Sequence, residues 1–312
     1  MMCDIINKIT KKLTSGSESS KQSSGCMQQV KSSSFGVPEV PRCRVKFLKQ
    51  LGVGSFAKTY KELLLAESPD ELPVTVAVRE LKENVSDTAR SDFLQELKFL
   101  ADLHHPNIIC VLGVITESEP ICMLCEGSSQ GCLPRFLMSR SPKLQESSSN
   151  GEVEDFLRID ELYLIASQVA AGMEYLASRC YVYNALMASS CYVGENLLVK
   201  ISEAEIKWNR MYIAEDLLEI RWMPPEVLCK PHITMEVNVW NFGVVLWEIF
   251  SYGRKPYQGL SGQEVVEKVK SLHLLECPDG CPTHAYDLML KCWHENPDKR
   301  PSFRNLLGWL KS

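Results

Sequence analysis

The sequence predicts an α+β fold in which a small β-rich lobe precedes a larger, mainly helical lobe. Short runs rich in β-branched and aromatic residues dominate before Gly131, whereas longer segments with helical spacing of apolar residues dominate after it. The 312 residues are 45% hydrophobic and 23% charged, which is typical of a globular protein long enough to bury a large core. We therefore expect one bilobal domain.

The predicted β-rich lobe contains five strands and one helix. Val45, Phe47 and Leu51 fit a first strand, which Gly52 is expected to end. The other strands are expected within 58–66, 74–82, 107–115 and 120–126. The helix is expected within 86–105, capped at Ser86 or Asp87, with three apolar residues on its inner face: Phe93, Leu97 and Leu100.

The second lobe is predicted to be built from helices. The expected helices lie within 159–179, 237–253, 261–272, 283–295 and 302–312. Segment 237–253 is apolar on every side, which predicts a fully buried helix. The polar segment 140–160 is expected to form an exposed loop.

Composition also bounds the domain organisation and the class of partner. Residues 1–42 are predicted to be a flexible Ser-rich leader, followed by one domain over 43–312, with an N-lobe of about 43–127 and a C-lobe of about 128–312. A net charge of −5 argues against a nucleic-acid partner. Thirteen scattered cysteines are typical of reduced thiols, and no apolar run reaches the roughly 18 residues of a membrane span, so we expect a cytoplasmic location.

Ordered motifs carry a resemblance to the protein kinases. They are "LGVGSFAKTY" at 51–60, "VAVRELK" at 76–82, Glu96 in the following helix, "RWMPPEV" at 221–227 and "CWHENPDKRPSF" at 292–303. The resemblance implies a bilobal kinase-like fold with a five-stranded antiparallel sheet in the N-lobe. The last two motifs are similar to those of tyrosine kinases.

Longer stretches resemble the intracellular domain of the Ror family of receptor tyrosine kinases. They are "LHHPNIICVLGVITESEPICMLCE" at 103–126, "AAGMEYLAS" at 170–178 and "CPDGCP" at 277–282. This resemblance implies the cytoplasmic portion of a single-pass, Wnt-responsive receptor, or a relative that has only the kinase-like domain.

The resemblance assigns five positions to a nucleotide site. Gly52 and Gly54 match the first two glycines of the phosphate-covering loop, but Ala57 replaces the third. Arg79 replaces the phosphate-binding lysine, and the planar guanidinium is a poor geometric substitute for an ammonium. Glu96 remains available to pair with Arg79. The site is therefore degenerate, and ATP binding is disfavoured.

The catalytic loop lacks an intact catalytic residue. Leu186 sets the register, which places Ala185 where the aspartate base belongs and Ser190 where the metal-binding asparagine belongs. Alanine has no titratable group, and loss of a general base alone costs roughly 10²–10⁴ in rate.

The metal-binding motif is altered as well. Glu203 keeps a carboxylate on a longer side chain, which disfavours the near-ideal octahedral geometry of Mg²⁺. Glu205 replaces a glycine and places a second negative charge near the expected phosphates. The alternatives are a metal held without nucleotide or carboxylates paired with Arg79 or Lys207. Tyr212 is the one tyrosine of the activation segment, and its role is open.

Positions that support the fold are mostly retained. Glu226 and Arg300 match a buried ion pair of the C-lobe, although Asn238 replaces the aspartate that supports the catalytic-loop backbone. Cys125 is expected to pack as a small hydrophobe at the back-pocket position. Cys277 and Cys281 have no second ligand pair at zinc spacing, so we expect an ordinary Pro-rich loop there.

We therefore predict a Ror-like tyrosine pseudokinase that serves as a signalling scaffold or allosteric partner, with no cofactor. Its expected partners are signalling proteins, including an active kinase or receptor. One alternative is a weakly active or unorthodox ATP-dependent tyrosine kinase that uses Arg79 and Glu203. Another is a protein that binds nucleotide without turnover.

Overall fold

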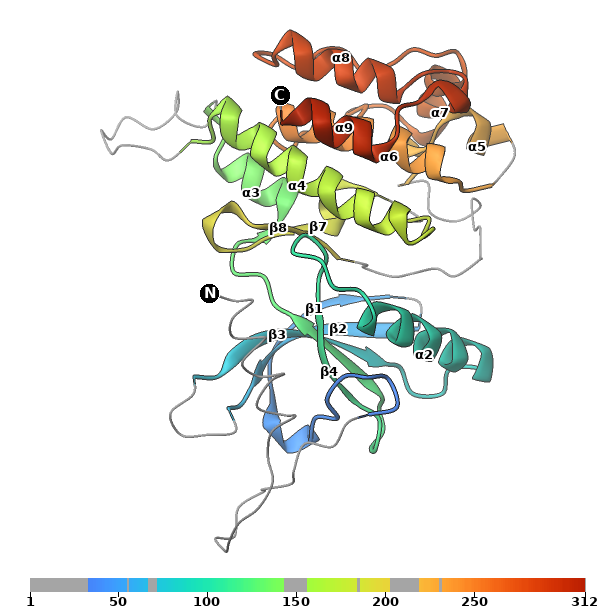
Figure 1. Ribbon diagram of the computed structural model, residues 1–312. Coiled ribbons are helices and arrows are strands. Elements are labelled where there is room, and N and C mark those ends of the chain that lie inside the picture. Colours follow the sequence, from blue (N-terminus) through green and yellow to red (C-terminus); the bar gives the residue numbers. More distant parts are fainter. Residues whose placement is uncertain are drawn as a thin grey trace, which may run out of the picture. The chain divides into compact units, whose positions relative to one another are not determined.

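The computed structural model describes residues 33–54, 56–66, 72–142, 156–183, 186–202, 219–229 and 232–311 (Figure 1). The chain divides into two compact units. The first contains Met1–Asp102 and Val111–Gly127, and the second contains Leu103–Cys110 and Ser128–Ser312. The second unit thus includes a short segment from within the range predicted for the N-lobe.

The first unit is a five-stranded antiparallel sheet with one long helix, α2, as the sequence predicted. The strand order is β1-β2-β3-β5-β4, and each neighbouring pair is antiparallel. The bounds are β1 Val45–Val53, β2 Ala57–Leu64, β3 Val74–Leu81, β4 Val111–Ile115, β5 Cys122–Glu126 and α2 Asp87–Ala101. This confirms the expected class and strand number.

Strand β1 differs from the prediction at Gly52. Gly52 does not end the strand, because β1 continues to Val53 and Gly52 is paired with Thr59. The register shifts between Gln50 and Gly52, so an irregularity within the strand accommodates the glycine. Phe47 and Leu51 are also 59% and 53% exposed, since β1 lies at the edge of the sheet. Val45, by contrast, packs against the apolar cluster of the sheet.

Helix α2 begins where the sequence predicted. The Ser86 hydroxyl accepts a hydrogen bond from the Ala89 backbone N–H at 3.2 Å, which is a standard N-cap. Phe93, Leu97 and Leu100 are buried, as expected from their helical spacing, and Glu96 is buried with them. A carboxylate on the inner face of the helix needs a partner, and the candidate site supplies it.

A segment that precedes β1 packs on the first unit. The Val40 N–H donates to the Val114 carbonyl at 2.7 Å, and the Val114 N–H donates to the Pro38 carbonyl at 2.9 Å. The buried Glu39 carboxylate accepts bonds from the backbone N–H and hydroxyl of Thr116, at 2.5 and 2.8 Å. Val40 also joins the apolar cluster of the sheet. Residues 38–40 are therefore part of the folded first unit, although we expected the folded domain to start at residue 43.

The second unit is mainly helical and carries a small sheet. Its helices are α3 Leu133–Ser139, α4 Ile159–Ser178, α5 Pro225–Cys229, α6 Met235–Phe250, α7 Gly262–Lys270, α8 Thr283–Cys292 and α9 Phe303–Leu310. The sheet has the order β6-β7-β8, from Gly131–Cys132, Cys191–Val193 and Val199–Ile201. Short 3-10 turns of this unit lie at Ala188–Ser190, Glu195–Leu197, Glu219–Trp222 and Pro297–Lys299, and one in the first unit lies at Arg42–Arg44.

Helix α6 forms the centre of this unit. All its residues from Val237 to Phe250 are buried, which confirms the prediction from its all-round apolar pattern. It packs against α4 and α8, and Phe242 meets Phe303 of α9 edge to face at 5.6 Å between ring centroids. Helix α6 is therefore the frame on which the loops of the candidate site are fixed.

Candidate functional site

The first unit holds the ion pair expected between β3 and α2. The Arg79 guanidinium on β3 pairs with the Glu96 carboxylate on α2 through its Nη1 atom. The Arg79 side chain is 8% exposed and that of Glu96 is 0% exposed, and the guanidinium also lies over the Phe93 ring at 5.8 Å. The pair links the helix to the sheet in a nearly dry setting, where loss of one charge is costly.

The Arg79 guanidinium keeps one donor for another group. Its Nη2 atom is buried and has no hydrogen-bond partner within the part of the chain that the structure describes. Buried donors are almost always satisfied, so a partner belongs there. A phosphate oxygen fits this position chemically. The Nη2 donor is therefore an observation in favour of the alternative of nucleotide binding.

The glycine-rich loop is partly described. The Gly54 N–H donates to the Ala57 carbonyl at 2.8 Å, and Ser55 between them lies outside the described residues. Ala57 opens β2, is buried and pairs with Leu81. Alanine therefore fits this position as an ordinary strand residue. A Cβ added at Gly52 would meet nothing within 4 Å, so the described chain itself does not require that glycine.

In the second unit, Asn238 of α6 holds the backbone of the catalytic loop. Its Oδ1 accepts from the Tyr183 N–H at 2.8 Å, and its amide donates to the Tyr183 carbonyl. Asn238 is fully buried. An aspartate could only accept. The amide of Asn238 therefore supplies a donor that the loop uses. From the sequence alone, asparagine at this position was only a departure from the kinase pattern.

Glu248, near the other end of α6, holds the next part of the loop. Its Oε2 accepts from the Ala188 N–H and from the Trp222 indole N–H, both at 2.9 Å. Burial raises the pKa of Glu248 to about 7, although these two hydrogen bonds lower it in part. Glu248 thus joins the loop to the end of the activation segment. Sequence reasoning missed this residue, although an acid within the largely apolar second half of the helix was the available signal.

Between these two anchors lies the position of the general base. Asn184 and Ala185 are outside the described residues, but the backbone on both sides of them is held by α6. Tyr183 is buried and its hydroxyl donates to the Ser202 carbonyl at 2.9 Å. The loop is thus anchored from both sides, and its sequence has alanine where a base would act.

Ser190 is used within its own turn. Its hydroxyl donates to the Met187 carbonyl at 2.7 Å and accepts from the Met187 N–H at 3.2 Å. The residue is buried, so both bonds are shielded from water. A metal would have to compete with these bonds. We conclude that Ser190 closes the turn Ala188–Ser190.

No group of three or more His, Cys, Asp or Glu side chains that could hold a metal ion occurs in the part of the chain that the structure describes. Glu203 and Glu205, and with them Ala204 and Tyr212, lie in the range 203–218 outside the described residues. The predictions made for those four residues stay predictions.

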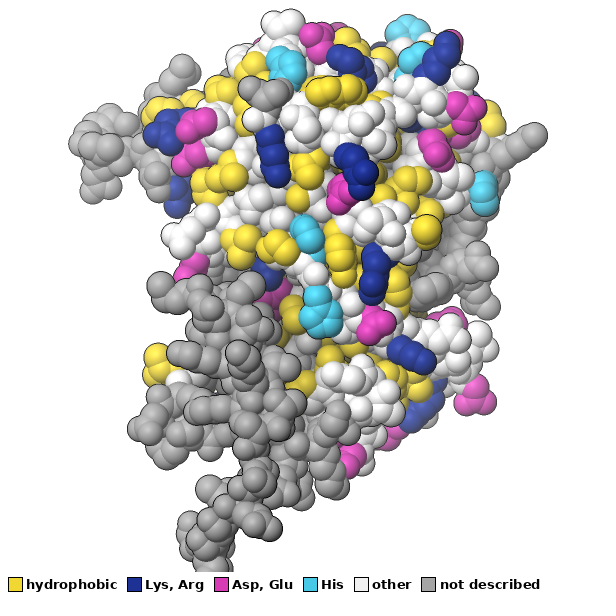
Figure 2. All heavy atoms as spheres, viewed as in Figure 1, with side chains coloured by type: hydrophobic (Ala, Val, Ile, Leu, Met, Phe, Trp, Pro, Cys, Tyr) yellow, Lys and Arg dark blue, Asp and Glu magenta, His cyan; other side chains and the backbone are white. Residues whose placement is uncertain are grey.

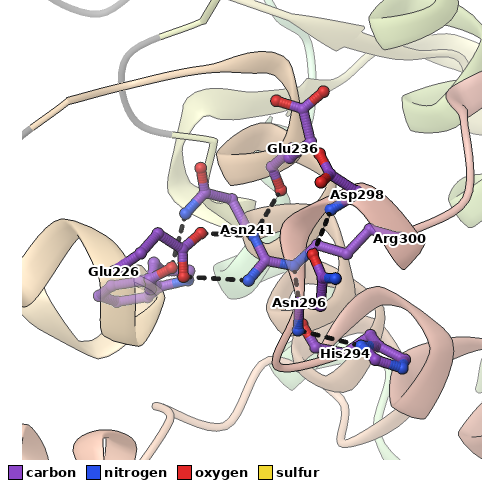
Figure 3. Close-up of polar contacts among 8 residues, drawn as sticks. Glu226, Glu236, Asn241, His294, Asn296, Asp298 and Arg300 are labelled. Carbon is purple, nitrogen blue, oxygen red and sulfur yellow. Dashed lines mark hydrogen bonds and ion pairs between the residues drawn. The ribbon is translucent and has the colours of Figure 1, made fainter.

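The Glu226–Arg300 pair that we expected in the C-lobe is present (Figure 3). The two Nη atoms of Arg300 contact the two carboxylate oxygens of Glu226 at 2.6 and 3.0 Å. Arg300 also donates to the carbonyls of Glu236 and His294, both at 3.0 Å, and lies over the Trp240 ring. The Arg300 side chain is 0% exposed and that of Glu226 is 33% exposed. The pair is thus buried at its arginine end.

Cys125 lies on β5, opposite Ala77 of β3, and is buried. It therefore packs within the sheet, as expected for a small hydrophobe.

The antiparallel sheet with its β3–α2 ion pair, and the helical unit with its anchored loop, are the features of a protein kinase domain. The model of the protein tyrosine and serine/threonine kinase family matches residues 45–310, and the chain belongs to this family.

The chain is similar to curated relatives that are receptors. The tyrosine-protein kinase transmembrane receptor Ror of Drosophila melanogaster is 44% identical over 274 residues, which are 86% of this chain and 38% of the receptor. The BDNF/NT-3 growth factors receptor of Gallus gallus is 36% identical over 290 residues, 91% of this chain and 35% of that receptor. The NT-3 growth factor receptor of Sus scrofa is 36% identical over 282 residues, 86% of this chain and 34% of that receptor. The chain thus spans less than two thirds of each relative's length.

No helix among the described residues is both long and apolar enough to cross a membrane.

Proposed function

We propose that this chain is a Ror-like tyrosine pseudokinase that acts as a signalling scaffold or allosteric partner in Wnt-type receptor signalling. The observation that carries the proposal is the loop around position 185. Buried Asn238 and Glu248 hold its backbone on both sides, while the methyl side chain of Ala185 cannot act as a base. The backbone support of a kinase catalytic loop is kept, and the catalytic base is absent.

Two further observations support the loss of phosphoryl transfer. Ser190 uses its hydroxyl for the turn, so the metal-holding amide of an active kinase has no counterpart at this position. The planar guanidinium of Arg79 differs in shape from the lysine ammonium that active kinases place on phosphates.

A scaffold acts by binding partners through its surface and needs no catalytic residue. Acidic and basic side chains alternate with hydrophobic ones on the face of the helical unit that Figure 2 shows. Such a mixed surface suits a protein partner, and binding to one conformation of an active kinase would shift that kinase's equilibrium. The expected partners are signalling proteins, among them an active tyrosine kinase or receptor.

Phosphotransfer assays test the proposal directly. The purified chain is incubated with labelled ATP, with Mg²⁺ or Mn²⁺, and a tyrosine-containing peptide. We expect no transfer above an Arg79→Ala/Glu203→Ala variant. Transfer that exceeds this control would replace the pseudokinase proposal with the alternative of a weak tyrosine kinase.

One structural feature favours nucleotide binding without turnover, namely the buried Nη2 donor of Arg79. Thermal-shift titration with ATP, with and without divalent metal, decides this point, because a ligand that binds the folded state raises its melting temperature. On the cofactor-free proposal we expect no saturable shift. A saturable shift without phosphotransfer would assign the chain a nucleotide-binding role.

A further inference from the structure

Cys277 and Cys281 flank a tight turn between α7 and α8. The Cys281 N–H donates to the Pro278 carbonyl at 3.0 Å, and Gly280 has a φ of 72°. A positive φ at the third position is the mark of a type II turn, and glycine adopts it without strain. The turn brings the chain back on itself and places the two cysteines at its ends.

The two thiols lie within reach of each other. Burial, and after it the charge of Cys277 and a side-chain hydrogen bond with Cys277, together raise the pKa of Cys281 to about 12. Cys277 is exposed, whereas Cys281 is half-buried. Of the pair, Cys277 is therefore the thiol that a reagent in solution meets first.

Bonds outside the turn hold its surroundings in place. The Tyr286 hydroxyl donates to the Leu275 carbonyl at 2.9 Å, and the Trp247 indole donates to the Glu276 carbonyl at 2.8 Å. Neither bond involves an atom between the two cysteines. A covalent link from Cys277 to Cys281 would therefore leave this frame intact.

We propose that Cys277 and Cys281 form a reversible modification site that low-molecular-weight disulfides oxidise to an intrachain disulfide. The Cys277 thiolate attacks one sulfur of the oxidant, whose S–S bond breaks and releases one thiol. The Cys281 thiol loses its proton to solvent and attacks the Cys277 sulfur of the mixed disulfide, which releases the second thiol. Two protein thiols are oxidised, and one small disulfide is reduced to two thiols.

This site is independent of phosphoryl transfer, because it uses neither the catalytic loop nor the β3–α2 pair. It gives the chain a chemical modification that no kinase motif predicts, on the helical unit that we propose as a docking surface. The result of an experiment on the two cysteines therefore does not depend on whether the pseudokinase proposal holds.

Mass spectrometry of the full folded chain tests the site. The chain is equilibrated with glutathione and glutathione disulfide over a series of ratios, quenched in acid, alkylated and digested. We expect the fragment that holds both cysteines to lose two hydrogens, about 2 Da, with a fraction that rises with the oxidised ratio and is reversed by dithiothreitol. Exposed Cys229 is the internal control and should form no intrachain link.

Variants identify the order of the two steps. Cys281→Ser should retain glutathione as a stable mixed disulfide on Cys277, whereas Cys277→Ser should leave Cys281 free. The proposal is overturned if both cysteines of the unmutated chain are alkylated at every ratio. It is equally overturned if that chain accumulates the Cys277 glutathione adduct to the same extent as Cys281→Ser.

Discussion

Asn238 and Tyr183, 55 residues apart in the sequence, exchange two hydrogen bonds in the buried centre of the helical unit. The Asn238 side chain both accepts from the Tyr183 N–H and donates to its carbonyl. This pairing needs an amide, because a carboxylate has no hydrogen to donate. The residue that departs from the kinase pattern is thus matched to the loop that it holds.

Replacing Asn238 with Asp should destabilise the fold, because the Tyr183 carbonyl would lose its donor and face a carboxylate oxygen. A buried group left unsatisfied costs about 1–3 kcal/mol. Urea unfolding measures this cost, which should shrink at low pH, where the aspartate is protonated and can donate. The control is Asn296→Asp, because exposed Asn296 uses only its oxygen, on the Asp298 N–H. Equal stability of Asn238→Asp and the unmutated chain would contradict the pairing.

Glu248 should make stability fall as pH rises. Its pKa is about 7 when folded and 4.5 when exposed, so between these values the unfolded chain releases a proton that the folded chain keeps. The free energy of unfolding should therefore decrease by about 3 kcal/mol from pH 4.5 to pH 7 and level off above.

The variant Glu248→Gln isolates this effect, since one amide oxygen can accept both bonds now made by Oε2. Other carboxyl groups contribute equally to both chains. We expect the stability of Glu248→Gln relative to the unmutated chain to increase by roughly 2–3 kcal/mol between pH 5 and pH 8. A difference that is constant with pH would mean that Glu248 ionises normally.

The Arg79–Glu96 pair should behave as a unit. Glu96→Gln leaves a buried guanidinium without its counter-charge and should cost about 3–5 kcal/mol. The uncharged double variant Arg79→Met/Glu96→Leu should cost less than Glu96→Gln alone, because neither charge is then buried. Equilibrium unfolding of the single and double variants measures the coupling. Additive costs would show that the two residues do not depend on each other.

Restoring the base alone should not restore phosphoryl transfer. Ala185→Asp returns a proton acceptor, but Ser190 still uses its hydroxyl on Met187, and position 79 still carries a planar guanidinium in place of the lysine ammonium. We expect the labelled-phosphate signal to stay at the level of Ala185→Asn, a control of the same size without a base. Activity in Ala185→Asp alone would show that the metal and phosphate positions are already competent.

Arg300→Lys should be strongly destabilising although it keeps the charge. A lysine cannot reproduce the two bonds to Glu226 together with those to two carbonyls, so about 2–4 kcal/mol should be lost. Arg304→Lys is the matched control, because exposed Arg304 makes a single contact with Glu174 at 3.5 Å and should change stability by under about 0.5 kcal/mol. Similar midpoints for the two variants in thermal unfolding would contradict the assigned role of Arg300.

Local sequence patterns predicted the elements whose signal lies within one segment. The spacing of Phe93, Leu97 and Leu100 predicted the inner face of α2, and the all-round apolar pattern predicted that α6 is buried. The ordered motifs predicted the Arg79–Glu96 and Glu226–Arg300 pairs. Helices α3 and α5 and the sheet β6-β7-β8 were missed, because segments of two to seven residues are too short for a periodic signal.

By itself the sequence determined the identity of the residues: alanine at 185, serine at 190 and asparagine at 238 follow from the motif register. Only the tertiary structure decided what those residues do. Ser190 closes its own turn, Asn238 supplies a donor that aspartate lacks, and Glu248 joins two segments. The tertiary structure also decided that Val40 packs on the sheet. The physical reason is that hydrogen bonding and burial between residues far apart in the chain leave no periodic trace in either segment.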